Sequence, residues 1–124
     1  DDVTIRGSLI ADGCHIGNNV TIEHSVIGLR TVIGDNVTIK NSVVMGADYM
    51  EDADELAPGR VPLGIGNNST VCGAILDKNS RIGTDVSITN SGNVDSLGED
   101  EPLQVRDGIS IVIKDGTIEN GFKF

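Results

Sequence analysis

The spacing of branched aliphatic residues constrains the fold of this 124-residue chain more than any other feature. Isoleucine or valine recurs in steps of six, six and five residues, so the pattern repeats every 17 residues. The first block contains Ile10, Ile16, Ile22, Ile27, Ile33, Ile39 and Val44. In a second block, Ile65 aligns with Ile82 and Val71 with Ile88 at the same period. This period predicts a solenoid in which three short strands close one triangular coil and the aliphatic residues point inward.

Glycine and asparagine occur where each six-residue unit must turn. Gly17 and Gly34 directly follow inward residues, and Asn19 and Asn36 stand next to the following strand. Asparagine tolerates left-handed backbone angles, which suits it to such turns. Four Asn-x-Ser/Thr sequons result, and we expect them to serve the turns rather than glycosylation; they begin at Asn19, Asn36, Asn67 and Asn68.

A core without large rings fits this interpretation. Aromatic residues make up 2% of the chain, whereas glycine accounts for 16 residues. Stacked columns of isoleucine and valine can fill a narrow prism, and coils about 4.8 Å apart would make five coils about 25 Å long. An amphipathic helix bundle is excluded, because the 3.6-residue spacing is absent and glycine and asparagine recur throughout.

Two segments interrupt the period and are predicted to leave the solenoid wall, at about residues 46–62 and 90–107. The first contains an acidic run, Glu51 to Glu55, which lacks the spacing of a calcium loop and is expected to be solvated. The final stretch, residues 109–124, is apolar again and is expected to cap the open end of the stack.

The net charge of −10 disfavours nucleic acid and anionic membranes as partners. No segment is apolar over the roughly 18 residues that a membrane span requires. Cys14 and Cys72 are far apart and are expected to be reduced, buried residues. Because the chain begins at Asp1, already inside the repeat, we expect it to be a fragment of a longer protein.

Three hypotheses for function follow from the residues. His15 or His24 could act as the base of a trimeric acyltransferase, but both fall at positions expected to face solvent, so no catalytic site is predicted. No metal site is predicted. Lys78, Arg81, Arg106 and Lys114 would form an anion site if they converge, suited to phosphate or phosphorylated metabolites. If they bind nothing, the chain is a structural scaffold.

Four segments carry a resemblance to a known family. They are HSVIGLRTVIGDNVTIKNSVVMGADYME, VPLGIGNNSTV, AILDKNSRIGTDVSITN and GISIVIKDGTI. Together they resemble the C-terminal domain of ADP-glucose pyrophosphorylase (glucose-1-phosphate adenylyltransferase), most closely that of the plant and cyanobacterial type. The resemblance covers nearly the whole chain, and the MGADYxE motif followed by VPxGIG is its most specific part.

The resemblance implies an all-β fold, a single-stranded left-handed parallel β-helix with two loop excursions, over residues 1–124. It implies a non-catalytic regulatory and assembly domain whose nucleotidyltransferase domain is absent here. In the family that other domain joins ATP to glucose 1-phosphate with Mg²⁺, giving ADP-glucose and pyrophosphate for starch or glycogen synthesis. No cofactor is implied for this chain, and the location would be the bacterial cytoplasm or the plastid stroma.

The resemblance also implies partners and site residues. The partners would be 3-phosphoglycerate or a similar activator, inhibitory phosphate, the catalytic domain of the same chain, and further subunits in a homo- or hetero-oligomer. By local motif, the activator lysines map onto Lys78 and Lys114, and two further basic positions onto Arg30 and Arg106, with Arg81 nearby. Asp107 replaces the serine that usually follows Arg106, and its carboxylate would weaken an anion site there.

Overall fold

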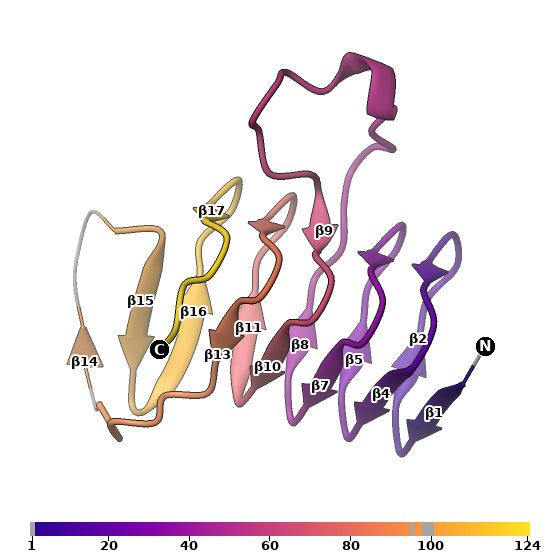
Figure 1. Ribbon diagram of the computed structural model, residues 1–124. Coiled ribbons are helices and arrows are strands. Elements are labelled where there is room, and N and C mark those ends of the chain that lie inside the picture. The colour runs from indigo at the N-terminus through magenta and orange to yellow at the C-terminus, as the bar shows by residue number, and fades with distance from the viewer. Residues whose placement is uncertain (1, 95, 98–100) are drawn as a thin grey trace.

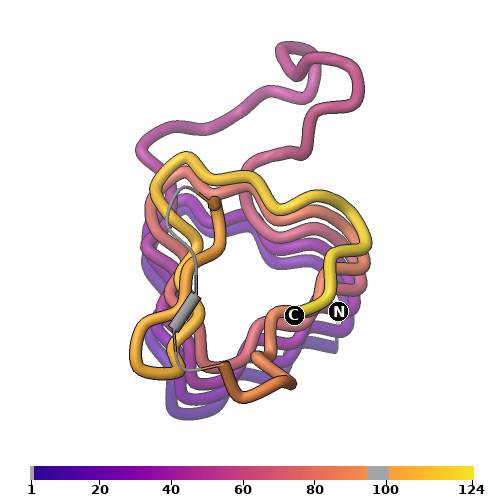
Figure 2. The backbone as a smooth tube through the Cα atoms, turned by 90° about the vertical axis from the view of Figure 1, so that its left-hand side faces the viewer, coloured from indigo at the N-terminus to yellow at the C-terminus, as the bar shows by residue number. Residues whose placement is uncertain are grey.

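Short strands wind into a parallel β-helix with a triangular cross-section in the computed structural model, which describes residues 2–94, 96–97 and 101–124 (Figures 1 and 2). The three sides of the triangle are three sheets, and each turn of the chain adds one strand to each sheet. The 17-residue period is visible in the pairing, since Leu9 lies opposite Val26 and Val26 opposite Val43. The predicted parallel solenoid is therefore confirmed.

The strands of the three sheets follow one another along the axis of the helix. Sheet A contains β1 (Val3–Arg6), β4 (Val20–Glu23), β7 (Thr38–Lys40), β10 (Thr70–Cys72) and β13 (Ser87–Ile88). Sheet B contains β2 (Leu9–Ile10), β5 (Val26–Ile27), β8 (Val43–Val44), β11 (Ala74–Leu76), β16 (Ile109–Val112), β15 (Leu103–Arg106) and β14 (Ser96–Leu97). Sheet C contains β3 (His15–Ile16), β6 (Val32–Ile33), β9 (Gly64–Ile65), β12 (Arg81–Ile82) and β17 (Thr117–Ile118).

The core consists of aliphatic columns, one from each sheet. In sheet A the column runs through Ile22, Ile39, Val71 and Ile88, all fully buried. Equivalent columns in the other two sheets meet it at the centre of the prism. Branched side chains hold few rotamers and stack with little loss of freedom, which is why a core without rings can be filled.

Polar ladders hold the corners of the triangle. Asn19 donates from its side-chain amide to Asn36 (2.8 Å), and Asn36 donates in the same way to Asn68 (2.9 Å). All three residues have φ near +60°. These three sequon asparagines therefore lie in the turns, as predicted. At the corner between sheets A and B, Ser25 and Ser42 form a second ladder, each hydroxyl accepting a backbone N–H from the next coil.

The parallel pairing is interrupted twice. Between β8 and β9 the chain leaves the wall as a long loop that contains the 3-10 turn η1 (Ala53–Glu55) and projects outward at one corner (Figure 2). Between β13 and β16 it leaves again, and β14 and β15 lie in this second segment. No helix in the described ranges is long and apolar enough to cross a membrane.

The expected cap is confirmed for sheet A and wrong for sheet B. At the end of sheet A, Lys123 forms a parallel bridge with Ser87, so the last residues do cover that edge. Residues 109–118 instead build the next coil as β16 and β17. The edge of sheet B is covered by β15, which pairs antiparallel with β16 through a turn at Asp107 and Gly108. A tight hairpin brings its strand back without another coil, which a repeat period does not reveal.

Candidate functional site

The turns that lead from sheet B to sheet C stack into one corner of the prism, here called the B–C corner and formed by residues 28–31, 45–48, 77–80 and 113–116. Successive turns are joined by backbone hydrogen bonds. Ala47 N donates to Leu29 O (2.9 Å), Asn79 N to Gly46 O (3.0 Å) and Asp115 N to Lys78 O (2.9 Å). Side chains at matching positions therefore lie one coil, about 4.8 Å, from their neighbours along this corner.

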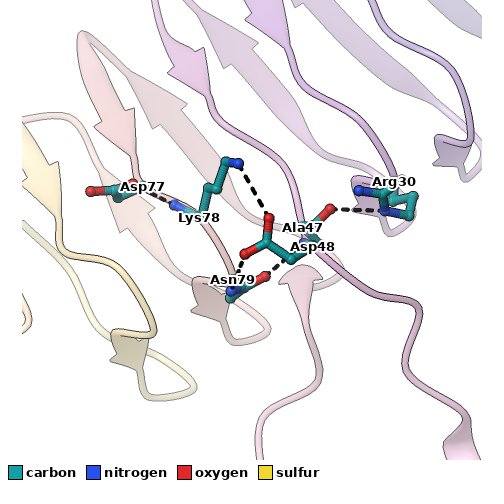
Figure 3. Close-up of polar contacts among 6 residues, drawn as sticks. All are labelled: Arg30, Ala47, Asp48, Asp77, Lys78 and Asn79. Atoms are coloured by element: carbon teal, nitrogen blue, oxygen red, sulfur yellow. Dashed lines mark hydrogen bonds and ion pairs between the residues drawn. The ribbon is translucent and has the colours of Figure 1, made fainter.

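Three of the five predicted cations occupy the B–C corner. Lys78 and Lys114 stand at the same turn position in consecutive coils. Arg30 belongs to an earlier coil, has a left-handed backbone (φ 58°), and donates from Nε to Ala47 O at 2.9 Å. Figure 3 shows Arg30 and Lys78 on either side of the turn that carries Ala47 and Asp48.

A carboxylate lies within this row of cations (Figure 3). Lys78 Nζ is 3.2 Å from Asp48 Oδ1, and Asn79 Nδ2 donates to Asp48 Oδ2 at 3.2 Å. Asn79 Oδ1 also accepts from the backbone N–H of Asp48 at 2.9 Å. The pKa of Asp48 is lowered, first by the hydrogen bond from Asn79, then by Lys78, with a smaller contribution from the charge of Lys114. Asp48 is therefore ionised at neutral pH and pairs with Lys78.

Arg81 lies away from this row, beneath the projecting loop. Its side chain is 7% exposed; Nη2 is 2.6 Å from Glu51 Oε2, and Nη1 donates to Glu51 Oε1 (3.0 Å) and to Val61 O (2.9 Å). The hydrogen bond from Arg81 lowers the pKa of Glu51, and the reverse interaction raises the pKa of Arg81. These contacts fasten the loop to the wall, so we leave Arg81 out of the proposed anion site.

Arg106 lies at the other end of the strands of sheet B, away from the B–C corner. It pairs with Ile109 where β15 meets β16, while Lys114 lies beyond the other end of β16. Its Nη1 donates to Val105 O at 3.0 Å, and Nη2 donates to Gln104 Oε1 at 3.4 Å. The structure therefore does not bring Arg106 together with Lys78 and Lys114.

The acidic run of the first loop is only partly solvated. Asp52, Asp54 and Glu55 are exposed, as expected. Glu51 instead bonds to Arg81, so the expectation of a solvated run is wrong for this carboxylate. Asp48, which precedes the run, is exposed and pairs with Lys78. The register of the coils could have placed Asp48 near Lys78. Val44 and Leu76 occupy the same position in neighbouring coils. Asp48 stands four residues after Val44 and Lys78 two after Leu76, so both fall in the turn that follows sheet B.

Other reactive side chains are spread over the surface. His15 in β3 and His24 after β4 are exposed, as predicted. Cys14 and Cys72 are free thiols that are only partly buried, so the expectation of buried cysteines is wrong; partial burial raises the pKa of Cys72. Within the ranges that the structure describes, no group of three or more His, Cys, Asp or Glu side chains is placed to hold a metal ion.

The comparison with protein families agrees with this geometry. The family model described as the GLGC left-handed parallel beta-helix domain matches residues 1–122, almost the whole chain. The match gives the handedness of the coils, which the spacing of the repeat does not determine. The chain therefore belongs to the GLGC left-handed parallel β-helix family, the C-terminal domain of glucose-1-phosphate adenylyltransferase.

Proposed function

We propose that this chain is the non-catalytic regulatory and assembly domain of a glucose-1-phosphate adenylyltransferase of the plant or cyanobacterial type. The catalytic domain of the same protein would use ATP with Mg²⁺ and glucose 1-phosphate to make ADP-glucose and pyrophosphate. This chain would bind no cofactor of its own. The protein would act in the bacterial cytoplasm or the plastid stroma, where starch or glycogen is made.

The observation that carries the regulatory part of the proposal is the row of cations at the B–C corner. Lys78 and Lys114 are exposed and stand in consecutive coils, and Arg30 lies on the same corner. Ammonium groups about one coil apart can both contact the oxygens of a single phosphate group. The chain is acidic overall, so an anion would be drawn to this corner only by the local charges.

The proposed ligand is a phosphorylated metabolite such as 3-phosphoglycerate, with inorganic phosphate as its competitor. Bound at Lys78 and Lys114, it would bridge this domain to the catalytic domain. Such a ligand activates the enzyme only if it binds the active arrangement more tightly than the inactive one.

Calorimetric titration of this chain with 3-phosphoglycerate, and separately with inorganic phosphate, tests the site. We expect Lys78→Ala and Lys114→Ala each to weaken binding about tenfold, because each removes one charge-assisted hydrogen bond. Lys40→Ala is the matched control: Lys40 and Lys78 are both 46% exposed and each pairs with one carboxylate, but Lys40 lies on sheet A.

If the isolated chain binds neither ligand, the same variants should be tested in the full-length enzyme. That experiment shows whether the site needs the catalytic domain to be complete or whether the chain has no anion site. A double Lys78→Ala, Lys114→Ala enzyme that keeps its normal response to 3-phosphoglycerate contradicts the regulatory proposal. The chain would then be a scaffold only.

The outer face of sheet B supports the assembly part of the proposal. Five strands present an aliphatic residue outward in direct register: Leu9, Val26, Val43, Ile75 and Ile111. The equivalent positions of sheet A are all hydroxyl residues: Thr4, Thr21, Thr38, Thr70 and Ser87. Leu9, Val26 and Val43 are among the exposed large apolar side chains.

The partner that best fits this face is a second copy of the same chain. Two copies with a net charge of −10 each repel one another, which favours contact through a face whose central positions are uncharged. Sheets A and B both have such a row, but only that of sheet B is aliphatic and gains from burial. A straight ladder with one residue per coil is also complementary to itself across a two-fold axis.

A further inference from the structure

The carboxylate of Asp48 occupies the place in which an anion bound by Lys78 would lie. Its Oδ1 is 3.2 Å from Lys78 Nζ, and its other oxygen accepts from Asn79. Asp48 comes from the base of the projecting loop, whereas Lys78 belongs to the wall of the next coil. A phosphate oxygen cannot take up the same position beside Nζ while the carboxylate remains there.

The ion pair between Lys78 and Asp48 can open at a small cost in free energy. The side chains of Lys78 and Asp48 are 46% and 45% exposed, and exposed ion pairs contribute little to stability. Three residues further along, Glu51 is held by the buried guanidinium of Arg81 and by the backbone N–H of Leu63 (3.0 Å). The Lys78–Asp48 ion pair can therefore open while the loop stays attached at Glu51 and through the hydrogen bonds between Asp48 and Asn79.

We propose that Asp48 is an internal counter-ion that competes with the phosphorylated ligand for Lys78, and that ligand binding releases the Asp48 carboxylate from Lys78 and so loosens the contact of Asp48 with the wall. This inference rests on the anion site proposed above. It adds a way for the ligand to act: occupancy of the corner is coupled to the contact between the loop and the wall, because both need the same ammonium group.

The competition has a defined direction. The pKa of Asp48 is lowered, so the carboxylate is charged at neutral pH and always opposes an incoming anion. Removing its charge while keeping its shape should tighten anion binding. An asparagine at position 48 can still accept the hydrogen bond from Asn79, so the turn itself should be kept.

The test is a calorimetric titration with inorganic phosphate of the unmodified chain and of Asp48→Asn. We expect phosphate to bind about two- to five-fold more tightly to Asp48→Asn, the range that an exposed ion pair supplies. Asp52→Asn is the matched control: it removes one charge from the same loop, and within the described part of the chain Asp52 makes no ion pair. It should change the affinity by much less.

Hydrogen exchange gives a second measurement on the unmodified chain. The backbone N–H of Asp48 donates to Asn79 Oδ1, and saturating phosphate should speed its exchange. Equal or weaker binding by Asp48→Asn, together with unchanged exchange, overturns the competition while leaving the anion site intact. If Lys78→Ala binds phosphate as well as the unmodified chain does, or if no variant binds it, the anion site is wrong and this inference falls with it.

Discussion

At the scale of single residues, the ion pair between Glu51 and Arg81 is the more buried of the two that join the projecting loop to the prism. Glu51 and Arg81 side chains are 16% and 7% exposed, and two nitrogen–oxygen contacts join them. Removing one partner of a buried pair leaves the other charge without compensation, which costs more than the pair contributes. Glu51 therefore matters for the stability of the loop.

We predict that Glu51→Gln lowers the free energy of unfolding by about 3 kcal/mol at pH 7, because Arg81 remains buried without a counter-ion. Glu55→Gln, an exposed residue of the same loop, should have almost no effect. Urea unfolding of both variants and the unmodified chain measures the difference. Equal losses in the two variants would contradict the assignment.

The pH dependence of this difference has a defined sign. The pKa of Glu51 lies below its ordinary value of 4.5, mainly because of the hydrogen bond from Arg81. A lowered pKa in the folded state means that the stabilisation is present above pH 4.5 and is lost as the pH falls through the folded value. The stability gap between the unmodified chain and Glu51→Gln should therefore shrink in acid; a gap that stays constant would contradict this.

At the scale of elements, the return of the loop into β9 depends on a backbone that only glycine adopts easily. Gly64 has φ +100°, and a Cβ there would collide with the carbonyl oxygen of Val32 in the neighbouring strand β6. Gly59, in the loop itself, has φ +80° but nothing within 4 Å of a Cβ. The two glycines share a left-handed backbone and differ in the space around them.

We predict that Gly64→Ala destabilises the chain by about 3 kcal/mol, from backbone strain together with displacement of β6. Gly59→Ala should cost about 1 kcal/mol, from backbone strain alone. Thermal or urea unfolding of both variants separates the two contributions. If both cost the same, the close approach of β9 to β6 does not matter for stability.

The period predicts the elements of the wall and fails at the excursions for a physical reason. The inward positions of β5 and β8, Ile27 and Val44, must stack because an unstacked aliphatic residue would leave a void, so counting residues gives their register. Leu76 also pairs with Val44, although a long loop separates them in sequence. Within the loop no such constraint acts. Alignment of Val44 with Leu76 can bring Asp48 and Lys78 into the same corner, but the period does not give the bond between their side chains. The hairpin strand β15 was not predicted either, because it pairs outside the repeating register.

At the scale of the whole molecule, the three faces of the prism differ in chemistry. The central outward positions of sheet A carry hydroxyl residues, whereas those of sheet B carry aliphatic residues in register. The projecting loop lies beside sheet C, where Val61 O accepts from Arg81 in β12. Sheet B is thus the face that offers apolar contact to the second copy proposed above.

The last prediction concerns this face. Val43→Lys places a charge in the middle of the aliphatic ladder, where a second copy would have to bury it. Because a buried unpaired charge costs several kcal/mol, this variant should weaken self-association at least about tenfold. Thr38→Lys adds the same charge in the same coil, but on sheet A, and should leave self-association unchanged. Sedimentation equilibrium over a range of concentrations measures both, and circular dichroism checks that each variant keeps its strands. If both variants associate as the unmodified chain does, or if the unmodified chain stays monomeric throughout, sheet B does not join two copies. If only Val43→Lys dissociates, the aliphatic ladder is the surface through which this domain assembles.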